Sequence, residues 1–275
     1  MTLSRRDINE LLADHGLAPR REFGQNFVGD PNTVRRIARL AGVGPGDHVV
    51  EIGAGLGSLT TALAESGASV LAIEIDHGIV PVLRSVVGDL NNVTVVEGDA
   101  LELSWSDLLA GCTSWVLVAN LPYNVGTPLV MDLLDTVPDI ARMVVMVQRE
   151  VAERMVANTR TSAYGAISVK VAYWATARIL GYVPATVFVP QPKVESALVE
   201  ITRRASPAVD GVDPLALFTL VKAGFAHRRK MLRRSLAGMV TIEQFDKAGI
   251  APTARAEELD VHAWGRLAHV LAGTS

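Results

Sequence analysis

Residues 49–57, Val49-Val50-Glu51-Ile52-Gly53-Ala54-Gly55-Leu56-Gly57, join a β-branched run to a glycine-rich turn, and a helical pattern follows from Ser58. The run predicts a buried strand. The glycines let the backbone approach a bound nucleotide without interference from a Cβ atom. The spacing is not the dinucleotide pattern G-x-G-x-x-G, because Gly57 falls one place early and Ser58 takes the last position. The stretch predicts a strand, a ligand-binding turn and a helix.

Short apolar runs alternate with helical stretches on both sides of this turn. The alternation predicts a mostly parallel sheet with helices on both faces, which is a Rossmann-like α/β fold. Two later runs, Arg178–Val183 and Val194–Arg203, predict an antiparallel closing hairpin. The expected parallel strands are His48–Ile52, Ser69–Ile75, Val93–Glu97, Trp115–Ala119 and Met143–Val147, and the expected helices are 4–14, 31–41, 58–66, 79–87, 127–135 and 150–156.

A change of composition marks a domain boundary. Residues 204–214 are rich in turn-forming residues and predict a linker. Beyond them the pattern is helical only, over about 215–225, 228–236, 242–248 and 256–271. We therefore expect an α/β domain over residues 1–205 and a small all-helical domain over 206–275.

Composition narrows the classes of protein. The 275 residues are 49% hydrophobic and include one cysteine, Cys112, so no internal disulfide forms and a reducing, cytoplasmic location is expected. We find no apolar stretch that would span a membrane and no cluster of metal ligands. The net charge of −3 conceals one basic run, which has no acidic residue and is suited to phosphate contact. Its cations are Lys222, Arg228, Arg229, Lys230, Arg233 and Arg234.

Two acidic residues follow expected strands of the α/β domain. Glu74 ends the second strand, where a carboxylate can accept hydrogen bonds from both hydroxyls of a ribose. Asp99 follows the third strand, where it can accept from an exocyclic adenine amine. Together with the glycine turn, these positions predict a site for an adenosine-containing cofactor.

The fourth strand runs into Asn120-Leu121-Pro122-Tyr123. Asn120 offers a side-chain carbonyl and Leu121 a backbone carbonyl, so the pair can accept both hydrogens of a planar amine. Pro122 stiffens the turn, and Tyr123 can stack on a base that has been taken out of its helix. The four residues therefore predict a catalytic site for an amino group on a nucleobase.

These segments resemble known enzymes. The glycine turn with Glu51 ahead of it resembles class I S-adenosylmethionine-dependent methyltransferases, and Asn120–Tyr123 resembles the [DNS]-[IVLP]-P-[FY] motif of amine methylation. Four further segments are similar to the ribosomal RNA adenine N6-dimethyltransferase family, most of all its KsgA-type bacterial branch. They are Phe23–Phe27, Tyr164–Val169, Val187–Ala197 and Phe225–Leu232.

The resemblance implies dimethylation at N6 of two adjacent adenosines in the 3′-terminal hairpin of 16S rRNA, in an assembling small subunit. It implies that S-adenosyl-L-methionine binds Asn26, the backbone of Val28, Gly53, Gly55, Glu74, Asp99 and Asn120. Many relatives have leucine where this chain has Val28, which a backbone contact should tolerate. We also expect Phe188 to stack on the base face opposite Tyr123, and the chain to act as a monomer.

Three other functions stay open at this point. A 23S rRNA adenine methyltransferase shares the sheet and the Asn-Leu-Pro-Tyr element. A glutamine N5-methyltransferase is disfavoured by Leu121 and by the basic C-terminal region. The chain is also compatible with a role mainly as an assembly factor that binds immature small subunits.

Overall fold

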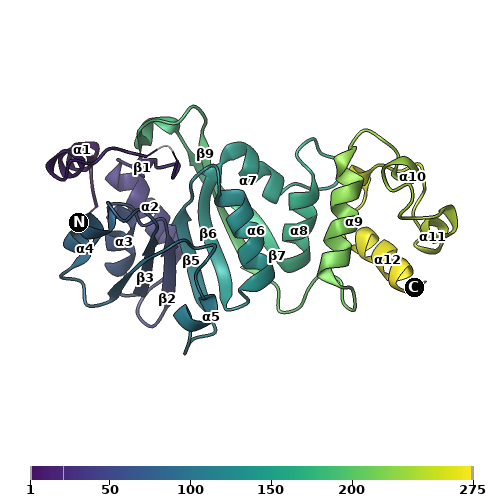
Figure 1. Cartoon of the computed structure of the whole chain (residues 1–275), viewed down its shortest axis with the longest axis horizontal. Coiled ribbons are helices and arrows are strands. Elements are labelled where there is room, and N and C mark those ends of the chain that lie inside the picture. Colours follow the sequence, from purple (N-terminus) through teal and green to yellow (C-terminus); the bar gives the residue numbers. More distant parts are fainter. Residues whose placement is uncertain (1, 21, 274–275) are drawn as a thin grey trace. The chain divides into compact units, whose positions relative to one another are not determined.

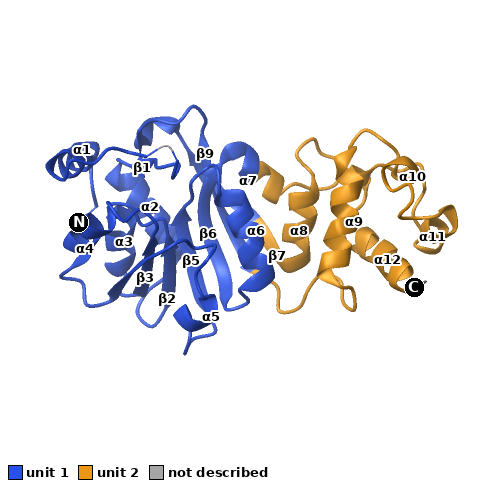
Figure 2. Cartoon of the chain, in the orientation of Figure 1, with its two compact units in different colours: residues 1–152, 178–202 blue, residues 153–177, 203–275 orange. Residues whose placement is uncertain are grey.

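The computed structural model describes residues 2–20 and 22–273 and divides into two compact units (Figure 2). Unit 1 contains residues 1–152 and 178–202, and unit 2 contains residues 153–177 and 203–275. The last passage of the chain from unit 1 to unit 2, between residues 202 and 203, lies within a few residues of the boundary expected near 205. Residues 153–177 differ from the sequence expectation, because they pack with the C-terminal helices rather than with the α/β core.

Unit 1 is built on a seven-stranded sheet, counted over the described residues, with strand order β4-β3-β2-β5-β6-β9-β7 (Figure 1). Neighbouring strands from β4 to β6 are parallel, and β9 is antiparallel to β6. Strands β1 and β8 form a separate antiparallel pair. The strands are β1 Phe27–Val28, β2 His48–Ile52, β3 Ser69–Glu74, β4 Val93–Glu97, β5 Trp115–Asn120, β6 Ile140–Gln148, β7 Ala175–Val183, β8 Phe188–Val189 and β9 Ser196–Arg203.

The expected strands are confirmed, with small shifts at their ends. The β6 strand starts three residues earlier than expected, at Ile140, and β9 starts two residues later, at Ser196. The short β1–β8 pair carries no sequence signal, because two-residue strands have no measurable periodicity. The parallel register aligns Ile52 with Ile73 and Glu74 with Glu97, so the carboxyl ends of these strands meet at one edge of the sheet.

Helices cover both faces of this sheet, as the alternation predicts (Figure 1). One face is buried by α2 and α3, whose apolar side chains join those of the central strands in one core cluster. The helix ends follow local rules: Ser4 caps α1 in a capping box with Asp7, and Asp30 caps α2 ahead of Pro31. The helices are α1 Arg5–Asp14, α2 Pro31–Ala41, α3 Ser58–Ala64, α4 Val80–Val87, α5 Trp105–Leu108, α6 Gly126–Thr136 and α7 Arg149–Met155.

Unit 2 is helical, and its core forms around Trp264, Tyr173 and Leu217. Helix α8 belongs to it because Tyr164, Val169 and Tyr173 are buried among residues of α9 and α12. This packing explains why residues 153–177 belong to unit 2 rather than to unit 1. The helices are α8 Ala166–Trp174, α9 Pro214–Ala226, α10 Leu232–Ser235, α11 Ile242–Lys247 and α12 Val261–Ala272, and two short 3₁₀ turns are η1 Ala185–Val187 and η2 Ala256–Glu258.

The expected helix over 228–236 is wrong for most of its length. Residues 227–230 form a turn, Met231 pairs with Arg255 in an isolated β-bridge, and only Leu232–Ser235 is helical. The backbone N–H of Leu232 donates to the Ala254 carbonyl, so a distant segment competes for the groups that a helix would use. Over the residues that the structure describes, no helix has the length and apolar character needed to cross a membrane.

Candidate active site

The residues expected to bind the cofactor gather at the carboxyl edge of the sheet in unit 1. Two cavities lie there and share Phe23, Gly53, Ile75 and Pro122 in their walls. The first cavity is also lined by Asn26, Val28, Glu51, Gly55, Glu74, Asn120, Leu121 and Tyr123. The second is also lined by Asp99, Ala100, Leu101 and Asn124. The structure thus brings every expected cofactor residue to one pair of adjoining cavities.

The glycine turn between β2 and α3 is held against β3. The backbone N–H groups of Gly53 and Ala54 both donate to the Ile73 carbonyl, at 2.9 and 3.1 Å. Gly55 has a φ of +56°, which disfavours any residue with a side chain. A Cβ at Gly55 would also lie 3.0 Å from the ring of Phe27. Both the backbone conformation and the close approach of Phe27 therefore explain glycine at this position.

Glu74 links the turn to the second strand of the site. Its carboxylate accepts from the Gly55 N–H at 2.7 Å and from the Asp76 N–H at 2.9 Å. Burial raises the pKa of Glu74, and the bonds from Asp76 and Gly55 partly offset this. Each carboxylate oxygen has a second lone pair. Glu74 is therefore fixed in place and can still accept hydrogen bonds from a ribose.

Glu51 is a functional candidate that the sequence singles out only as the acidic residue ahead of the glycines. Its side chain is 1% exposed and lines the first cavity, and its Oε2 has no hydrogen-bond partner among the described residues. The pKa of Glu51 is raised to about 8, chiefly by burial and to a smaller extent by the nearby Glu74 carboxylate. The Thr60 hydroxyl lies close enough to lower this pKa in part, although its Oγ1 makes no well-formed hydrogen bond.

An orphaned, buried carboxyl group is unfavourable unless a ligand supplies a partner. A cationic ligand in the first cavity would supply that partner. Glu51 therefore fits a cofactor with a positively charged group. The signal that could have identified it is a single acidic residue in an otherwise apolar strand.

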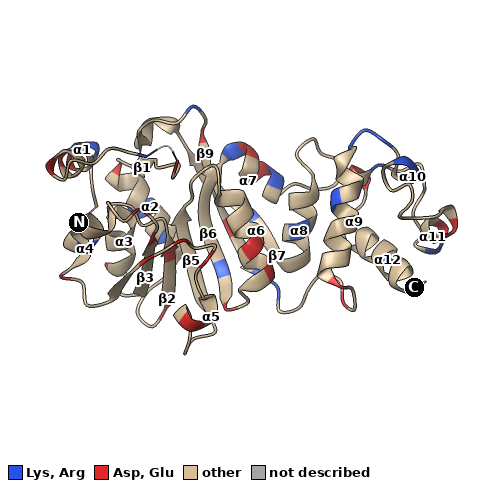
Figure 3. Cartoon of the chain, viewed as in Figure 1, with Lys and Arg blue, Asp and Glu red and all other residues tan. Residues whose placement is uncertain are grey.

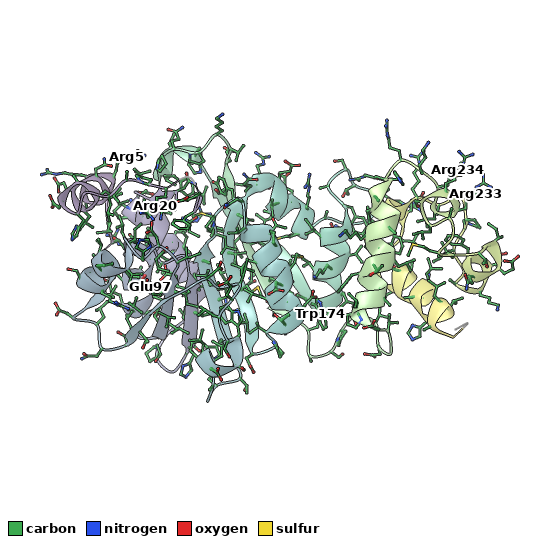
Figure 4. The ribbon with its side chains drawn as sticks, in the orientation of Figure 1. Arg5, Arg20, Glu97, Trp174, Arg233 and Arg234 are labelled. Atoms are coloured by element: carbon green, nitrogen blue, oxygen red, sulfur yellow. The ribbon has the colours of Figure 1, made fainter. Side chains whose placement is uncertain are left out.

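An N-terminal segment, residues 23–28, forms one wall of the first cavity and is tied to the strand ends. The Asn120 Nδ2 donates to the Asn26 carbonyl at 2.8 Å, and the Gln25 Nε2 donates to the buried Asp76 carboxylate at 2.8 Å. The Arg20 guanidinium also pairs with Asp76, at 3.4 Å (Figure 4). Asn26 is thus tied directly to the end of β5, and Val28 lies in the short strand β1.

The turn from Asn120 to Tyr123 is rigid. The Leu121 N–H donates to the Met146 carbonyl at 3.1 Å, and the Pro122 carbonyl accepts from the Gly126 N–H at 2.8 Å, where α6 begins. Because the amide nitrogen of Asn120 is held by Asn26, its Oδ1 is the atom left to accept from a substrate. The geometry of this turn agrees with its expected role as an acceptor of an exocyclic amine.

Tyr123 is fixed at both ends. Its backbone belongs to the turn after β5, and its hydroxyl lies 2.6 Å from the Ser196 Oγ at the start of β9. Burial raises the pKa of the Tyr123 phenol, and the bond with Ser196 partly offsets this. The phenol is therefore neutral at physiological pH, and the ring can stack on a base without a charge.

Phe188 does not occupy the position expected from the sequence. It is 0% exposed and packs in the core cluster with Val34 and Ile37 of α2, and it is absent from the walls of both cavities. Its strand β8 pairs with β1, and the Arg5 side chain donates to its carbonyl at 3.0 Å (Figure 4). The expectation that Phe188 stacks on the substrate base is therefore corrected: in this structure it is a core residue. Phe23 and Phe27 are the phenylalanines that line the first cavity.

The basic run lies in unit 2 and extends from the second half of α9 through the following turn into α10 (Figure 3). Arg228 also has partners within unit 2, because its Nε pairs with Glu257 at 2.7 Å and its Nη2 donates to the Thr161 carbonyl at 3.0 Å. Its expected contact with RNA stays a prediction. The exposed cations are Lys222, Arg229, Lys230, Arg233 and Arg234, and Figure 4 labels the last two. Within residues 2–20 and 22–273, no group of metal-ligating side chains gathers.

Comparison with known proteins identifies the family. The profile of the family described as ribosomal RNA adenine dimethylase matches residues 16–273. The chain belongs to this family. It is 48% identical to the ribosomal RNA small subunit methyltransferase A of Cutibacterium acnes, over 95% of this chain and 92% of that protein. It is 40% identical to the protein of the same name from Enterococcus faecalis, over 95% of this chain and 93% of that protein.

Solved structures confirm the class I methyltransferase fold. A dimethyladenosine transferase from Plasmodium falciparum superposes with a TM-score of 0.75 at 24% identity, over 86% of this chain and 94% of that chain. The 23S rRNA methyltransferase ErmE superposes with a TM-score of 0.67 at 27% identity, over 90% of this chain and 99% of that chain. Ligands of open α/β sheets bind beyond the carboxyl ends of the strands, which is the edge where the two cavities lie.

Proposed function

We propose that this chain transfers methyl groups from S-adenosyl-L-methionine to N6 of two adjacent adenosines in the 3′-terminal hairpin of 16S rRNA, during assembly of the small ribosomal subunit. The observation that carries the proposal is the position of Asn120–Tyr123, in the wall of the cavity that the glycine turn and Glu74 also line. The relatives that share 40–48% of their residues with this chain are named for the small subunit, which favours 16S over 23S rRNA.

The chain offers matching groups for each part of the cofactor. Gly53 and Gly55 let the protein backbone approach the cofactor closely. Glu74 accepts hydrogen bonds from the ribose of the cofactor, and Asp99 at the second cavity accepts one from its adenine amine. Asn26, the Val28 backbone and Asn120 surround the remaining, methionine end, next to the unpartnered Glu51. When bound, S-adenosylmethionine supplies an electrophilic methyl group on a sulfonium.

The residues of the turn act on the nucleophile. Adenine N6 is a weak nucleophile because its lone pair is delocalised into the ring. The Asn120 Oδ1 and the Leu121 carbonyl accept the two N6 hydrogens, draw the nitrogen towards a tetrahedral geometry and direct its lone pair at the methyl carbon. These carbonyl dipoles also stabilise the positive charge that develops on N6. Because the turn is rigid, it also holds N6 in a fixed orientation towards the methyl group, which raises the rate of transfer.

Base stacking holds the adenine in the cavity. Tyr123 stacks on one face, and each such contact contributes about 1–3 kcal/mol, enough to offset much of the cost of unstacking the base. With Phe188 in the core, Phe23 and Phe27 are the aromatic residues nearest the cavity that are placed to contact the base or the cofactor.

The exposed basic residues of unit 2 hold the RNA backbone. Lys222, Arg229, Lys230, Arg233 and Arg234 present cationic groups without a neighbouring acid in their sequence. Phosphate contacts position an RNA without reading its sequence, so this surface orients the subunit while the cavity selects the base. We further propose that the enzyme acts as a monomer and works in the cytoplasm, because its substrate is a ribosomal subunit.

Reversing two of these charges is expected to weaken RNA binding alone. The double variant Arg229→Glu, Arg233→Glu should lower the affinity for small subunits at least tenfold. The slope of the logarithm of the binding constant against the logarithm of salt concentration should decrease by about two, because two phosphate contacts are lost. Filter binding across a salt series measures this. Lys247→Glu, on exposed Lys247 of α11 outside the basic run, is the matched control and should bind normally. A large loss of cofactor affinity in the double variant, measured by calorimetry, would contradict the assignment of RNA binding to the basic run and of cofactor binding to the cavities of unit 1.

Labelled cofactor tests the function directly. Small and large ribosomal subunits from cells that lack this gene are incubated separately with the protein and methyl-labelled S-adenosylmethionine. We expect label in the small subunit only, and a primer-extension stop at two adjacent adenosines of the 3′-terminal hairpin. Label in the large subunit would favour the 23S activity instead. Binding and maturation of the subunit without any label would favour a purely assembly-related role.

A further inference from the structure

Ser196 is the buried partner of the proposed catalytic tyrosine. It is 0% exposed and is the first residue of β9, where it pairs with Gln148 of β6. Its Oγ lies 2.6 Å from the Tyr123 hydroxyl, and either hydroxyl can donate. The two residues lie 73 positions apart, so this contact joins the turn after β5 to a strand of the antiparallel half of the sheet.

Packing encloses Tyr123 only in part. It lines the first cavity, together with Gly53, Glu74 and Asn120, so it is not enclosed by protein on that side. It also lines a crevice with Thr127, Val147 and Val151 that is too narrow to hold a water molecule. The hydrogen bond at its far end holds it in one orientation.

We propose that Ser196 is a positioning residue for methyl transfer: its hydroxyl anchors the Tyr123 hydroxyl and so fixes the plane against which the target adenine stacks. Ser196 touches neither the base nor the cofactor and acts through Tyr123. The inference rests on the proposed function, because it assigns a role within the same site.

The energetics of the bond set the size of the effect. The net contribution of one neutral hydrogen bond is a modest share of the stability of the protein. A misplacement of about 1 Å in a reacting group lowers a rate by as much as a hundredfold. Loss of the bond should therefore alter the rate more than the stability.

A double-mutant cycle tests the inference, with methyl transfer to small subunits as the assay. Ser196→Ala and Tyr123→Phe should each lower kcat about tenfold, and the double variant should be no slower than either, because both substitutions remove the same bond. The KM for S-adenosylmethionine should not change, and calorimetric affinity for the cofactor should match the parent protein. The melting temperature should shift by no more than about 3 °C.

A second buried serine provides the matched control. Ser168 is 2% exposed, and its hydroxyl donates to the Arg154 carbonyl within unit 2. Ser168→Ala should lower the melting temperature and leave kcat unchanged.

Three results would overturn the inference. The first is wild-type kcat in Ser196→Ala, and the second is the same loss of kcat from Ser196→Ala in the Tyr123→Phe background as in the parent. The third is a fall in kcat that follows only from unfolding. A parent protein that fails to methylate small subunits would instead refute the proposed function itself, so the two failures are distinguishable.

Discussion

Replacing Asn120 with alanine is expected to lower kcat for methyl transfer about a thousandfold while the protein remains folded. The substitution removes the Oδ1 that accepts from adenine N6, and the loss of one such aligned group typically costs two to three orders of magnitude in rate. The fold should survive, because the bond from the Asn120 Nδ2 to the Asn26 carbonyl contributes only about 1 kcal/mol. Single-turnover kinetics on small subunits, with circular dichroism of the variant, measure both effects.

Two further variants make this result specific. Asn120→Asp keeps an oxygen acceptor but places a carboxylate against the Asn26 carbonyl, so it should retain more activity than alanine and bind the cofactor less tightly. Asn91, which is exposed in the turn before β4, provides the control: Asn91→Ala should behave as the parent. Full activity of Asn120→Ala on small subunits would refute the proposed mechanism.

Replacing Glu51 with glutamine is expected to stabilise the protein increasingly as the pH rises. Burial first, and then Glu74, hold the pKa of Glu51 at about 8, whereas the same carboxyl in the unfolded chain ionises near 4.5. Between these values the folded state binds more protons than the unfolded state, so the free energy of unfolding falls as the pH rises from about 5 to 8. Glutamine does not titrate and removes this loss.

The expected difference in the free energy of unfolding between Glu51→Gln and the parent is large. The free energies of unfolding of the parent and Glu51→Gln should be similar near pH 4.5 and should differ by up to about 4 kcal/mol at pH 8, in favour of the variant. Thermal unfolding across this range measures the difference. Glu97→Gln, at the exposed end of β4, should show no such divergence (Figure 4). Parallel curves for Glu51→Gln and the parent would show that folding does not raise the pKa of Glu51.

The same variant should be impaired in binding. A neutral amide cannot pair with a cationic cofactor, so calorimetry should report weaker binding of S-adenosylmethionine to Glu51→Gln. S-adenosylhomocysteine lacks the sulfonium charge, and its affinity should fall less. A gain in stability with a loss of affinity is the pattern expected when a strained group is kept for function.

Local signals made most of the fold predictable. The β-branched runs predict the central strands, and the caps at Ser4 and Asp30 predict the helix starts, because each depends on a few neighbouring residues. The glycine turn and the strand ends predict Glu74, Asp99 and Asn120 for the same reason, since parallel strands share one carboxyl edge.

The features that the sequence did not predict arise from contacts between distant segments. Phe188 is a core residue because β8 pairs with β1, and nothing near Phe188 in the sequence encodes that pairing. Arg228 has acidic and carbonyl partners at Glu257 and Thr161, which a count of local charge does not reveal. Ser196 lies within a segment noted for its family resemblance, but only the folded chain shows which side chain it meets.

The pairing of β1 with β8 has a consequence for how the chain acquires its native state. Phe27 meets Val189, and the Arg5 side chain donates to the Thr186 carbonyl across 181 positions of sequence. Contacts of such high sequence separation form slowly, after the local ones. We therefore expect a nascent chain to complete its parallel strands before the wall contributed by residues 23–28 is secured. We expect the first cavity to be complete only after Val189 has been synthesised.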